Sequence, residues 1–368
     1  MNLGPRSIVI IGGGVSGLSA AYYLAKAGVP SLLVEKRHWL GGVIRTEVVE
    51  GCVIDTGPDS YLTQKPAASE LARELGLGGE IIGSNDHLRK TFIRRDGRFL
   101  PLPDGLQMMV PTRVGPLVTT NLLSWRTKLR MGFEWFRKAP AAPLPDRSVA
   151  DFVRDHYGDE AVDYLAEPLL AGVYGGDPRT LSATSVLPRF VDLENKYGSL
   201  TRGTLAAIAF RNRDALPSRD ALPSRDALRS RDREGADAAA PLFQTLKGGL
   251  GQLTAALEKS IERHARRVRG EAEAIERTGR GYRVRVSGAW TDATALVLAT
   301  EAHSAARLSA RLDARLSELL ETIGYSTGIT LALGFDRAAT GDPEGFGFLI
   351  PKKERRLLMA CTYVGNKF

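Results

Sequence analysis

The uncharged stretch Ser7–Ala25 constrains the fold more than any other part of this 368-residue chain. It begins with a short β-branched run, Ile8–Ile11, which is typical of a buried parallel strand. A G-x-G-x-x-G turn follows directly, and Val15–Ala27 then has the pattern of a helix that ends at Gly28. The stretch is long enough to resemble a membrane span, but its central glycines divide it into two parts with different periods. We therefore predict strand, turn and helix in a soluble α/β protein.

The turn has the spacing of a dinucleotide-binding site. Gly12 permits a tight turn, Gly14 lets the backbone approach a pyrophosphate, and Gly17 lets helix and strand pack closely. The pyrophosphate is then expected at the unpaired N–H groups of the helix N-terminus. A second short strand, Ser31–Val34, ends at Glu35, whose carboxylate can accept hydrogen bonds from ribose hydroxyls. This acid argues against a 2′-phosphate, and hence against NADP, but it does not distinguish NAD from FAD. The alternative is an ordinary tight turn with a solvated glutamate.

Composition restricts the other classes of protein. Two cysteines, Cys52 and Cys361, exclude a disulfide framework and a four-cysteine metal site. Lys and Arg number 50 against 42 Asp and Glu, and the resulting net charge of +8 favours anionic ligands only weakly. The length predicts two or more domains. The five histidines and the carboxylates form no evident catalytic group, and we expect no metal site.

Motifs after the glycine turn resemble the FAD-binding entry of the amine-oxidase-like flavoproteins. They are Leu40–Thr46, with a glycine pair and a cationic Arg45, and Asp55–Ser60. The resemblance implies FAD as the cofactor, although a plain surface arginine remains the alternative for Arg45. The cofactor-binding residues that it implies are Gly12, Gly13, Gly14, Val15, Ser16, Gly17, Glu35, Lys36, Gly41, Gly42, Val43, Arg45, Gly57, Pro58, Asp59, Ser60 and Ala272.

Three later segments narrow the resemblance. Arg147–Phe152, Glu167–Pro178 and Phe243–Leu250 resemble the oxygen-dependent protoporphyrinogen and coproporphyrinogen oxidases of haem biosynthesis, and Gly57–Ser60 is more similar to the bacterial coproporphyrinogen III branch. The resemblance implies oxidation of a porphyrinogen to a porphyrin, with FAD taking hydride and oxygen reoxidising it, so that no acid–base pair is needed. An amine oxidase, a carotenoid desaturase and an inactive truncated remnant remain alternatives. Family members continue beyond Phe368, so we expect this chain alone to bind FAD poorly or to aggregate.

The resemblance also implies a discontinuous domain organisation, with a Rossmann-like FAD-binding domain, an α+β substrate domain and an inserted helical domain. The expected ranges are 1–50 and 241–300 for the FAD-binding domain, 51–110 and 301–368 for the substrate domain, 111–203 for the helical domain, and 204–240 for a disordered insert that contains a tandem hexamer at 213–230. A porphyrinogen carries propionates, and Lys90, in a basic cluster, is the candidate partner for one of them.

Residues 122–136 have the pattern of a basic amphipathic helix. Leu122, Trp125, Leu129, Phe133 and Phe136 recur at helical spacing, with arginines and lysines between them. Such a helix can lie on an anionic membrane, but apolar stripes more often pack on a core. We expect core packing here and keep peripheral membrane contact as the alternative. The sequence predicts a cytoplasmic protein that does not bind nucleic acid, and it indicates no oligomeric state.

Overall fold

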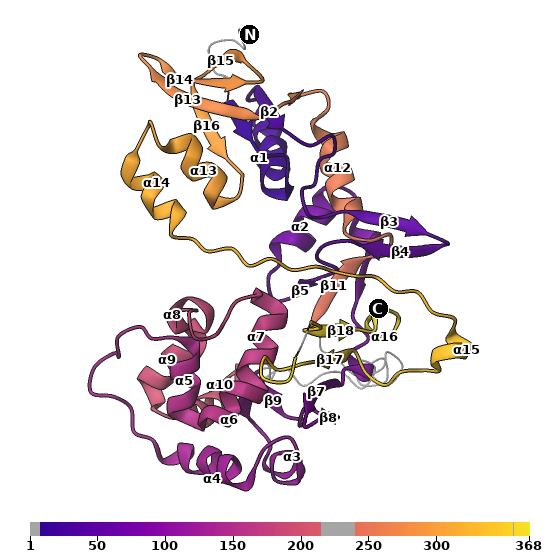
Figure 1. Cartoon of the computed structure of the whole chain (residues 1–368), viewed down its shortest axis with the longest axis vertical. Coiled ribbons are helices and arrows are strands. Elements are labelled where there is room, and N and C mark those ends of the chain that lie inside the picture. Colours follow the sequence, from indigo (N-terminus) through magenta and orange to yellow (C-terminus); the bar gives the residue numbers. More distant parts are fainter. Residues whose placement is uncertain (1–7, 215–239, 356) are drawn as a thin grey trace, which may run out of the picture. The chain divides into compact units, whose positions relative to one another are not determined.

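The computed structural model describes residues 8–214, 240–355 and 357–368, which form two compact units (Figure 1). Unit 1 takes its described residues from Met1–Ser84, Ala240–Tyr325 and Ile329–Gly334, and unit 2 from Asn85–Ala239, Ser326–Gly328 and Phe335–Phe368. This division differs from the domain ranges expected from the sequence. Residues 51–84 and 301–325, expected in the substrate domain, lie in the same unit as the glycine turn.

Unit 1 is built on a four-stranded parallel sheet with the strand order β12-β2-β1-β16. Its strands are β1 (Ile8–Ile11), β2 (Ser31–Glu35), β12 (Ala265–Arg269) and β16 (Ala295–Leu298). The glycine turn connects β1 to helix α1 (Val15–Lys26). The predicted succession of strand, turn, helix and strand is therefore confirmed, and the chain has an α/β fold.

Each face of this sheet is covered by a different layer. Helices α1 and α12 (Gly251–Ile261) cover one face, where Leu18 and Leu257 pack with Ile10. An antiparallel sheet covers the other face, where Val284 packs with Val9. Its strands are β13 (Ala272–Thr278), β14 (Gly281–Val286) and β15 (Ala289–Ala293). Because side chains alternate along β1, its buried residues serve both layers, as the continuous apolar run predicts.

The other elements of unit 1 are small. Strands β3 and β4 form an antiparallel hairpin, and β5, β11 and β6 form a three-stranded sheet in that order. Their bounds, with those of the short helices, are β3 (Thr46–Val49), β4 (Cys52–Asp55), β5 (Tyr61–Leu62), β6 (Ile81–Gly83), β11 (Phe243–Leu246), α2 (Ala67–Glu74), η1 (Gly78–Glu80), α13 (Ala302–Ser309) and α14 (Ala314–Glu321).

Unit 2 combines a four-stranded sheet with a group of helices. The sheet has the order β18-β17-β7-β8, and β9 pairs separately with β10. The strands are β7 (Thr91–Arg95), β8 (Arg98–Pro101), β9 (Leu106–Gln107), β10 (Val110–Pro111), β17 (Gly347–Leu349) and β18 (Ala360–Thr362). The helices are η2 (Asp86–Leu88), α3 (Val114–Thr119), α4 (Trp125–Phe133), η3 (Glu134–Phe136), α5 (Val149–Tyr157), α6 (Asp159–Ala161), the π-helix η4 (Val162–Ala166), α7 (Glu167–Tyr174), α8 (Ala183–Val186), α9 (Pro188–Tyr197), α10 (Leu200–Asp214), α15 (Arg337–Thr340) and α16 (Val364–Lys367).

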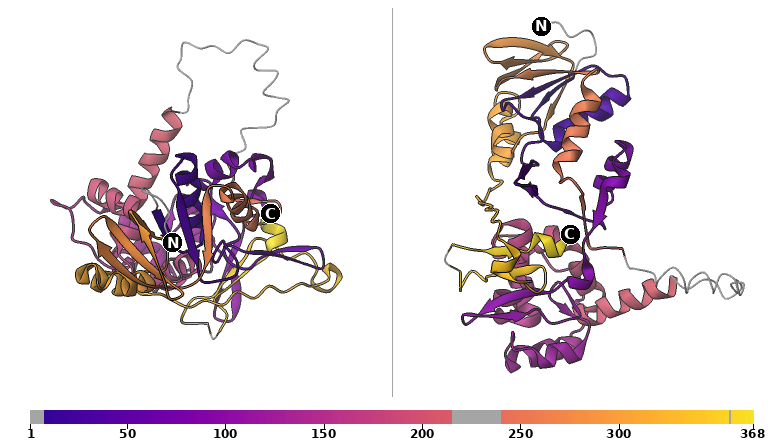
Figure 2. Two further views of the ribbon diagram at one scale, coloured as in Figure 1. Left: turned by 90° about the horizontal axis from the view of Figure 1, so that it is seen from above. Right: turned by 90° about the vertical axis from the view of Figure 1, so that its right-hand side faces the viewer.

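The helix α10 corrects the start of the predicted insert. Residues 204–214, expected to be disordered, continue this helix, which extends beyond its neighbours in unit 2 (Figure 2). The helix includes Arg213 and Asp214, the first two residues of the tandem hexamer. The rest of the hexamer, residues 215–230, lies outside the described residues.

A buried group of charged residues lies among the helices of unit 2. The ring of His156 lies between two carboxylates, with Nδ1 2.9 Å from Glu134 and Nε2 2.9 Å from Glu194. Arg147 donates to Glu194 at 2.7 Å, and Glu134 also accepts hydrogen bonds from the N–H groups of Leu200 and Thr201 at the start of α10. Burial alone raises the pKa of Glu194, but the hydrogen bonds from His156 and Arg147 outweigh it and lower that pKa to about 2.

The expected core packing of the apolar stripe at 122–136 is wrong for most of its residues. Leu122 is fully buried, but Trp125, Leu129, Phe133 and Phe136 are exposed. The reason is the buried charged group, because α4 and η3 turn Met131 and Glu134 toward the core instead. A buried carboxylate needs its partners, and here they lie on the side opposite the aromatic stripe.

Candidate functional site

A pocket of about 590 Å³ lies where the parallel strands of unit 1 end. Its walls are formed by the turn after β1, the residues that end and follow β2, and the segments that follow β12 and β16. These are the carboxyl ends of all four strands, and an open parallel sheet binds its ligands at that edge. We call this cavity the glycine-turn pocket.

The glycine turn lines the pocket with backbone instead of side chains. Gly12 has a φ of +109°, and a Cβ atom there would lie 2.4 Å from the carbonyl oxygen of Ala299. A Cβ at Gly17 would lie 1.9 Å from the carbonyl oxygen of Gly12, so that position holds helix and strand together. Gly14 differs, because a Cβ there would meet no protein atom within 4 Å. Gly12 and Gly17 are therefore needed for the packing of the turn itself, and a Cβ at Gly13 would lie 2.9 Å from the Cβ of Glu35, whereas Gly14 leaves space open.

Glu35 joins the end of β2 to the glycine turn. Its Oε2 accepts a hydrogen bond from the N–H of Gly13 at 2.6 Å, and its Oε1 accepts one from the N–H of Arg37 at 2.8 Å. The side chain is half-buried and lines the pocket. A carboxylate that is oriented by two backbone donors keeps its other lone pairs for a ligand.

A second pair of glycines closes one side of the pocket. The N–H of Gly41 donates to the carbonyl oxygen of Gly13 at 2.8 Å, and a Cβ at Gly42 would lie 3.1 Å from the Cα of Gly14. Gly57 in turn contacts the backbone of Val43, where a Cβ would lie 2.1 Å from the carbonyl oxygen. Three segments that are distant in sequence thus meet through backbone contacts that side chains would prevent.

Asp55 fixes the loop before α12. Its carboxylate accepts hydrogen bonds from the Thr46 hydroxyl and from the N–H of Leu250 at 3.1 Å, and Thr46 accepts one from the N–H of Gly251 at 2.8 Å. Burial raises the pKa of Asp55, although these hydrogen bonds oppose the shift. The hairpin β3–β4 and the start of α12 are therefore held together beside the pocket.

The structure brings most of the predicted site residues together. Those that line the pocket are Gly12, Gly14, Val15, Ser16, Glu35, Lys36, Gly41, Gly42, Val43, Pro58 and Ala272. The predicted residues outside its lining are Gly13, Gly17, Arg45, Gly57, Asp59 and Ser60. Of these, Arg45 is exposed, forms an ion pair with Glu47 at 2.8 Å and lies over the ring of Trp39.

Lys90 belongs to unit 2, whereas the residues that line this pocket belong to unit 1. Its ammonium group forms an ion pair with Glu344 at 2.6 Å and lies 5.4 Å from the ring centre of Phe92. We expected Lys90 to pair with a carboxylate of the substrate. In the structure, its partner is a carboxylate of the chain itself, that of Glu344.

Several lining residues were not predicted from the sequence. They follow β16 and begin α13: Thr300, Glu301, Ser304, Arg307 and Leu308. The apolar run at 295–300, followed by a helix, is the sequence feature that could have indicated them. A parallel strand of this sheet must end at the same edge as β1, so the residues that follow it lie at the pocket. Glu271 and Glu273, on either side of Ala272, also line the pocket.

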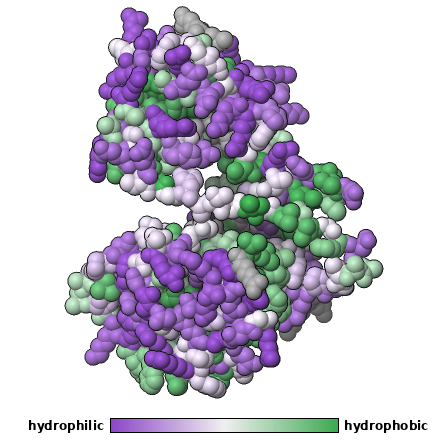
Figure 3. Space-filling model, in the orientation of Figure 1, coloured by the Kyte–Doolittle hydropathy of each residue, from purple (hydrophilic) through white to green (hydrophobic). Residues whose placement is uncertain are grey.

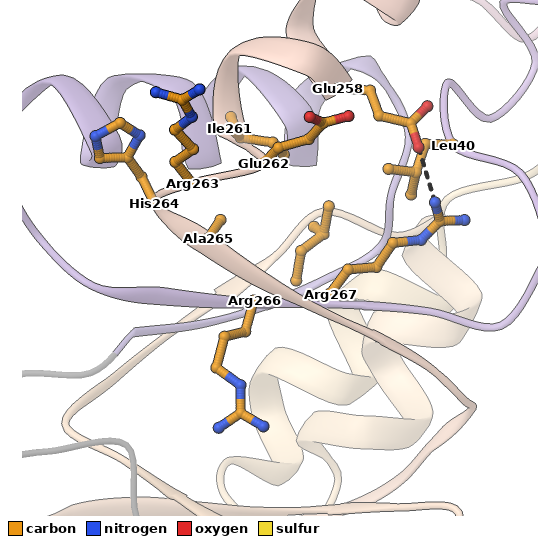
Figure 4. Close-up of a pocket in the computed structure, with 10 residues that line it drawn as sticks. Leu40, Glu258, Ile261, Glu262, Arg263, His264, Ala265, Arg266 and Arg267 are labelled. Carbon is orange, nitrogen blue, oxygen red and sulfur yellow. Dashed lines mark hydrogen bonds and ion pairs between the residues drawn. The ribbon is translucent and has the colours of Figure 1, made fainter.

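A second pocket of about 450 Å³ lies where α12 ends and β12 begins (Figure 4). Arg267 forms an ion pair with Glu258 at 2.8 Å and donates to the carbonyl oxygen of His38. Arg263 and Arg266 point to opposite sides of the strand. The basic side chains of this pocket point in different directions, and the acidic Glu258 and Glu262 lie between them. The pocket is therefore not suited to bind an anion.

The comparisons with known proteins decide the family. A model of the family "flavin containing amine oxidoreductase" matches residues 15–361. The chain belongs to this family. It is 30% identical over 376 residues to coproporphyrinogen III oxidase of Bacillus subtilis, which covers all of this chain and 75% of that protein. It is 40% identical over 260 residues to the enzyme of the same name from Propionibacterium freudenreichii, which covers 68% of this chain and 48% of that protein.

A solved structure agrees with this assignment. The chain resembles a protein from Exiguobacterium sp. 255-15 that is assigned as a protoporphyrinogen oxidase, with a TM-score of 0.76 and 26% identity. The match covers all of this chain and 74% of that one. The likeness extends through both units, so the α/β fold described above is that of a flavoprotein oxidoreductase.

The residues of the glycine-turn pocket fit FAD, the cofactor of this family. The side-chain-free surface at Gly14 leaves space for a diphosphate at the N-terminus of α1, and Glu35 stands where a ribose is expected. In the described part of the chain, no helix is long and apolar enough to cross a bilayer. Among the same residues, no group of three or more His, Cys, Asp or Glu could hold a metal ion.

Proposed function

We propose that this chain is an FAD-dependent oxidase that converts coproporphyrinogen III to coproporphyrin III, a reaction of haem biosynthesis, with oxygen as the final electron acceptor. The observation that carries the proposal is the match along the whole chain to coproporphyrinogen III oxidase, together with a pocket of the right construction for FAD. Protoporphyrinogen IX is the second substrate to test, because the matched solved structure is assigned to that reaction.

When bound, FAD supplies hydride acceptance from a ring carbon and reoxidation by oxygen. The residues of this chain supply binding and orientation. The N–H groups at the start of α1 provide a positive end for the diphosphate, and Gly14 and Gly42 let it approach the backbone. Glu35 accepts from the ribose hydroxyls while Gly13 and Arg37 hold its carboxylate in place. Each two-electron step removes one hydride from a ring carbon and one proton from a pyrrole nitrogen, and water can accept that proton. No acid–base pair is therefore required of the protein.

Porphyrin fluorescence in air tests this proposal. The purified chain with added FAD is incubated with coproporphyrinogen III or protoporphyrinogen IX, against a blank without protein. We expect a faster rise than the blank with coproporphyrinogen III, and the ratio of the two rates identifies the preferred substrate. Rates equal to the blank with folded, FAD-loaded protein refute the assignment, and release of peroxide from an amine would point to an amine oxidase instead.

The cellular setting is part of the proposal. We place the reaction in the cytoplasm, where the reduced state of the two free cysteines would persist. We also propose peripheral contact with a membrane surface through the apolar residues that α4 and η3 expose, Trp125, Leu129, Phe133 and Phe136. In Figure 3, hydrophobic residues gather along the edge where Figure 1 places α4.

A further inference from the structure

Helix α13 lines the glycine-turn pocket at the end of β16. The N–H of Ala299 donates to the carbonyl oxygen of Ile11 at 2.8 Å, so the strand end lies against the start of the turn. A Cβ at Gly12 would lie 3.2 Å from Cγ2 of Thr300. The helix begins two residues later, at Ala302. Its first turn therefore stands beside the backbone at which we expect the diphosphate of FAD.

Arg307 extends its side chain along this helix toward the pocket. Its Nη2 donates to the hydroxyl of Ser304 at 3.3 Å, one turn nearer the start of α13, which is the direction that helical side chains favour. Both residues line the pocket, with Ser304 buried and Arg307 exposed. Among the residues that the structure describes, no carboxylate forms an ion pair with Arg307. Its charge is therefore held at the pocket wall by a neutral partner.

The acidic side chains of the pocket make a positive partner for the diphosphate necessary. The glutamates of the lining are Glu35, Glu271, Glu273 and Glu301. Glu273 is paired with Arg285 at 3.0 Å, and the carboxylate of Glu35 is held by backbone N–H groups. A diphosphate brings two further negative charges, and the N-terminus of α1 offers the equivalent of only about half a positive charge. A cation in the lining is needed to offset the repulsion.

The cations in the lining are Lys36, Arg37 and Arg307. Lys36 and Arg37 directly follow Glu35, on the side where the ribose is expected, and the guanidinium of Arg37 lies 5.4 Å from the ring centre of Trp39. Arg45, the cation expected from the sequence, is outside the lining and is paired with Glu47. Arg307 is therefore the lining cation that is next to the first turn of α13 and has no ring or carboxylate partner among the described residues.

We propose that Arg307 is a cofactor-binding residue whose guanidinium pairs with a phosphate oxygen of FAD. The N–H groups of the glycine turn and the guanidinium of Arg307 would then bind the same diphosphate. Hydrogen bonds from a guanidinium to phosphate are charge-assisted and about twice as strong as those between neutral groups. The inference rests on the proposed placement of FAD in the glycine-turn pocket, and it does not depend on which substrate is oxidised.

Titration of the full chain with FAD, followed by flavin fluorescence, tests this pairing. We expect Arg307→Ala to raise the dissociation constant about tenfold, and Arg307→Lys to raise it no more than about threefold because the charge is kept. Arg311→Ala is the matched control, because Arg311 follows four residues later, is also exposed and is outside the pocket lining. It should bind FAD like the unaltered chain. Melting temperatures of the apoproteins should agree, which separates binding from folding.

Displacement of FAD by ADP and by adenosine distinguishes the diphosphate from the base and the ribose. We expect Arg307→Ala to weaken the binding of ADP about tenfold and to leave the binding of adenosine unchanged. Raising the salt concentration from about 0.05 to about 0.5 M should weaken FAD binding less in Arg307→Ala than in the unaltered chain, because the variant has lost an ionic contact.

Unchanged affinity of Arg307→Ala for FAD overturns the proposal. An equal loss for ADP and adenosine also overturns it, because the guanidinium would then contact the base or the ribose, and so does an unaltered chain that binds no FAD. If Gly14→Ala weakens FAD binding and Arg307→Ala does not, only the role of Arg307 fails. If neither variant does, the placement of FAD fails as well. Since these titrations contain no porphyrinogen, a negative turnover assay with coproporphyrinogen III leaves their result intact.

Discussion

Two single substitutions, Gly14→Ala and Gly17→Ala, should separate binding of FAD from stability of the fold. Gly14→Ala should weaken binding, and Gly17→Ala should destabilise the fold. A Cβ at Gly17 would lie 1.9 Å from the carbonyl oxygen of Gly12 and 3.4 Å from the Cβ of Ala299, so α1 must move away from β1. We therefore expect Gly17→Ala to lower the free energy of unfolding by about 3 kcal/mol, the upper end of the usual range for overpacking. At Gly14 the same methyl group meets no protein atom within 4 Å, and the φ of −70° is open to alanine. We expect the apoprotein of Gly14→Ala to be as stable as the unaltered chain.

The effect of Gly14→Ala should appear only when FAD is present. The methyl group would occupy the space into which the diphosphate fits, and we expect the dissociation constant to rise by about a hundredfold, or about 2.7 kcal/mol. Linkage turns this into a stability measurement. FAD at a hundred times the dissociation constant of the unaltered chain should stabilise it by about 2.7 kcal/mol, but should stabilise the variant by only about 0.4 kcal/mol.

Thermal or urea unfolding of the full chain without FAD measures the stability of the apoprotein, and the same experiment with FAD measures the stabilisation by the cofactor. Flavin fluorescence titration gives the dissociation constant directly. Gly79→Ala is the matched control, because a Cβ at Gly79 also meets nothing within 4 Å but lies in η1, outside the pocket lining. It should change neither quantity. Unaltered FAD affinity in Gly14→Ala would refute the placement of the diphosphate, and loss of apoprotein stability would show that Gly14 serves the fold.

Three further changes test other parts of the structure. Glu35→Gln should raise the FAD dissociation constant about tenfold, because the amide replaces a charged acceptor beside the ribose, and fluorescence titration measures it; an unchanged value contradicts the ribose contact. Glu194, with its pKa lowered to about 2, stabilises the fold above the unfolded value of about 4.5, and this contribution is lost as the pH falls from about 4.5 to 2. Between pH 7 and pH 3 the free energy of unfolding measured in urea should therefore fall by about 2 kcal/mol more in the unaltered chain than in Glu194→Gln, and an equal fall in both would contradict this role. Asp55 has a raised pKa, so its ionisation opposes folding as the pH rises, and Asp55→Asn should be at least as stable as the unaltered chain at pH 7, whereas Asp55→Ala should lose about 1–2 kcal/mol because it leaves the N–H of Leu250 without its acceptor; equal stability of the two variants in urea would contradict the role of that hydrogen bond.

The sequence predicted the part of the site that local rules determine. The strand β1, the glycine turn and α1 follow from residues within one continuous stretch, and Glu35 follows from the end of the next strand. The contributions of Ser304 and Arg307 were not predictable in the same way, because they reach the pocket through the pairing of β16 with β1, nearly three hundred residues along the chain. No periodic pattern within α13 records that pairing. Long-range neighbours of a pocket can be inferred only after the strand order is known.

The aromatic stripe of α4 shows a second thing that the sequence pattern could not predict. The pattern predicts that the helix exists, but not which of its sides is buried. Helical spacing correctly predicts that Trp125, Leu129 and Phe133 share one side. It does not say whether that side meets the core, because the orientation of α4 is decided by Glu134, whose buried carboxylate is bound by His156 and by the first N–H groups of α10. Leaving this carboxylate in the core without those partners would cost more than exposing an apolar side chain. A polar residue with fixed partners can therefore determine which side of a helix is buried, and an apolar stripe that is left outside predicts an apolar partner beyond the chain's own core.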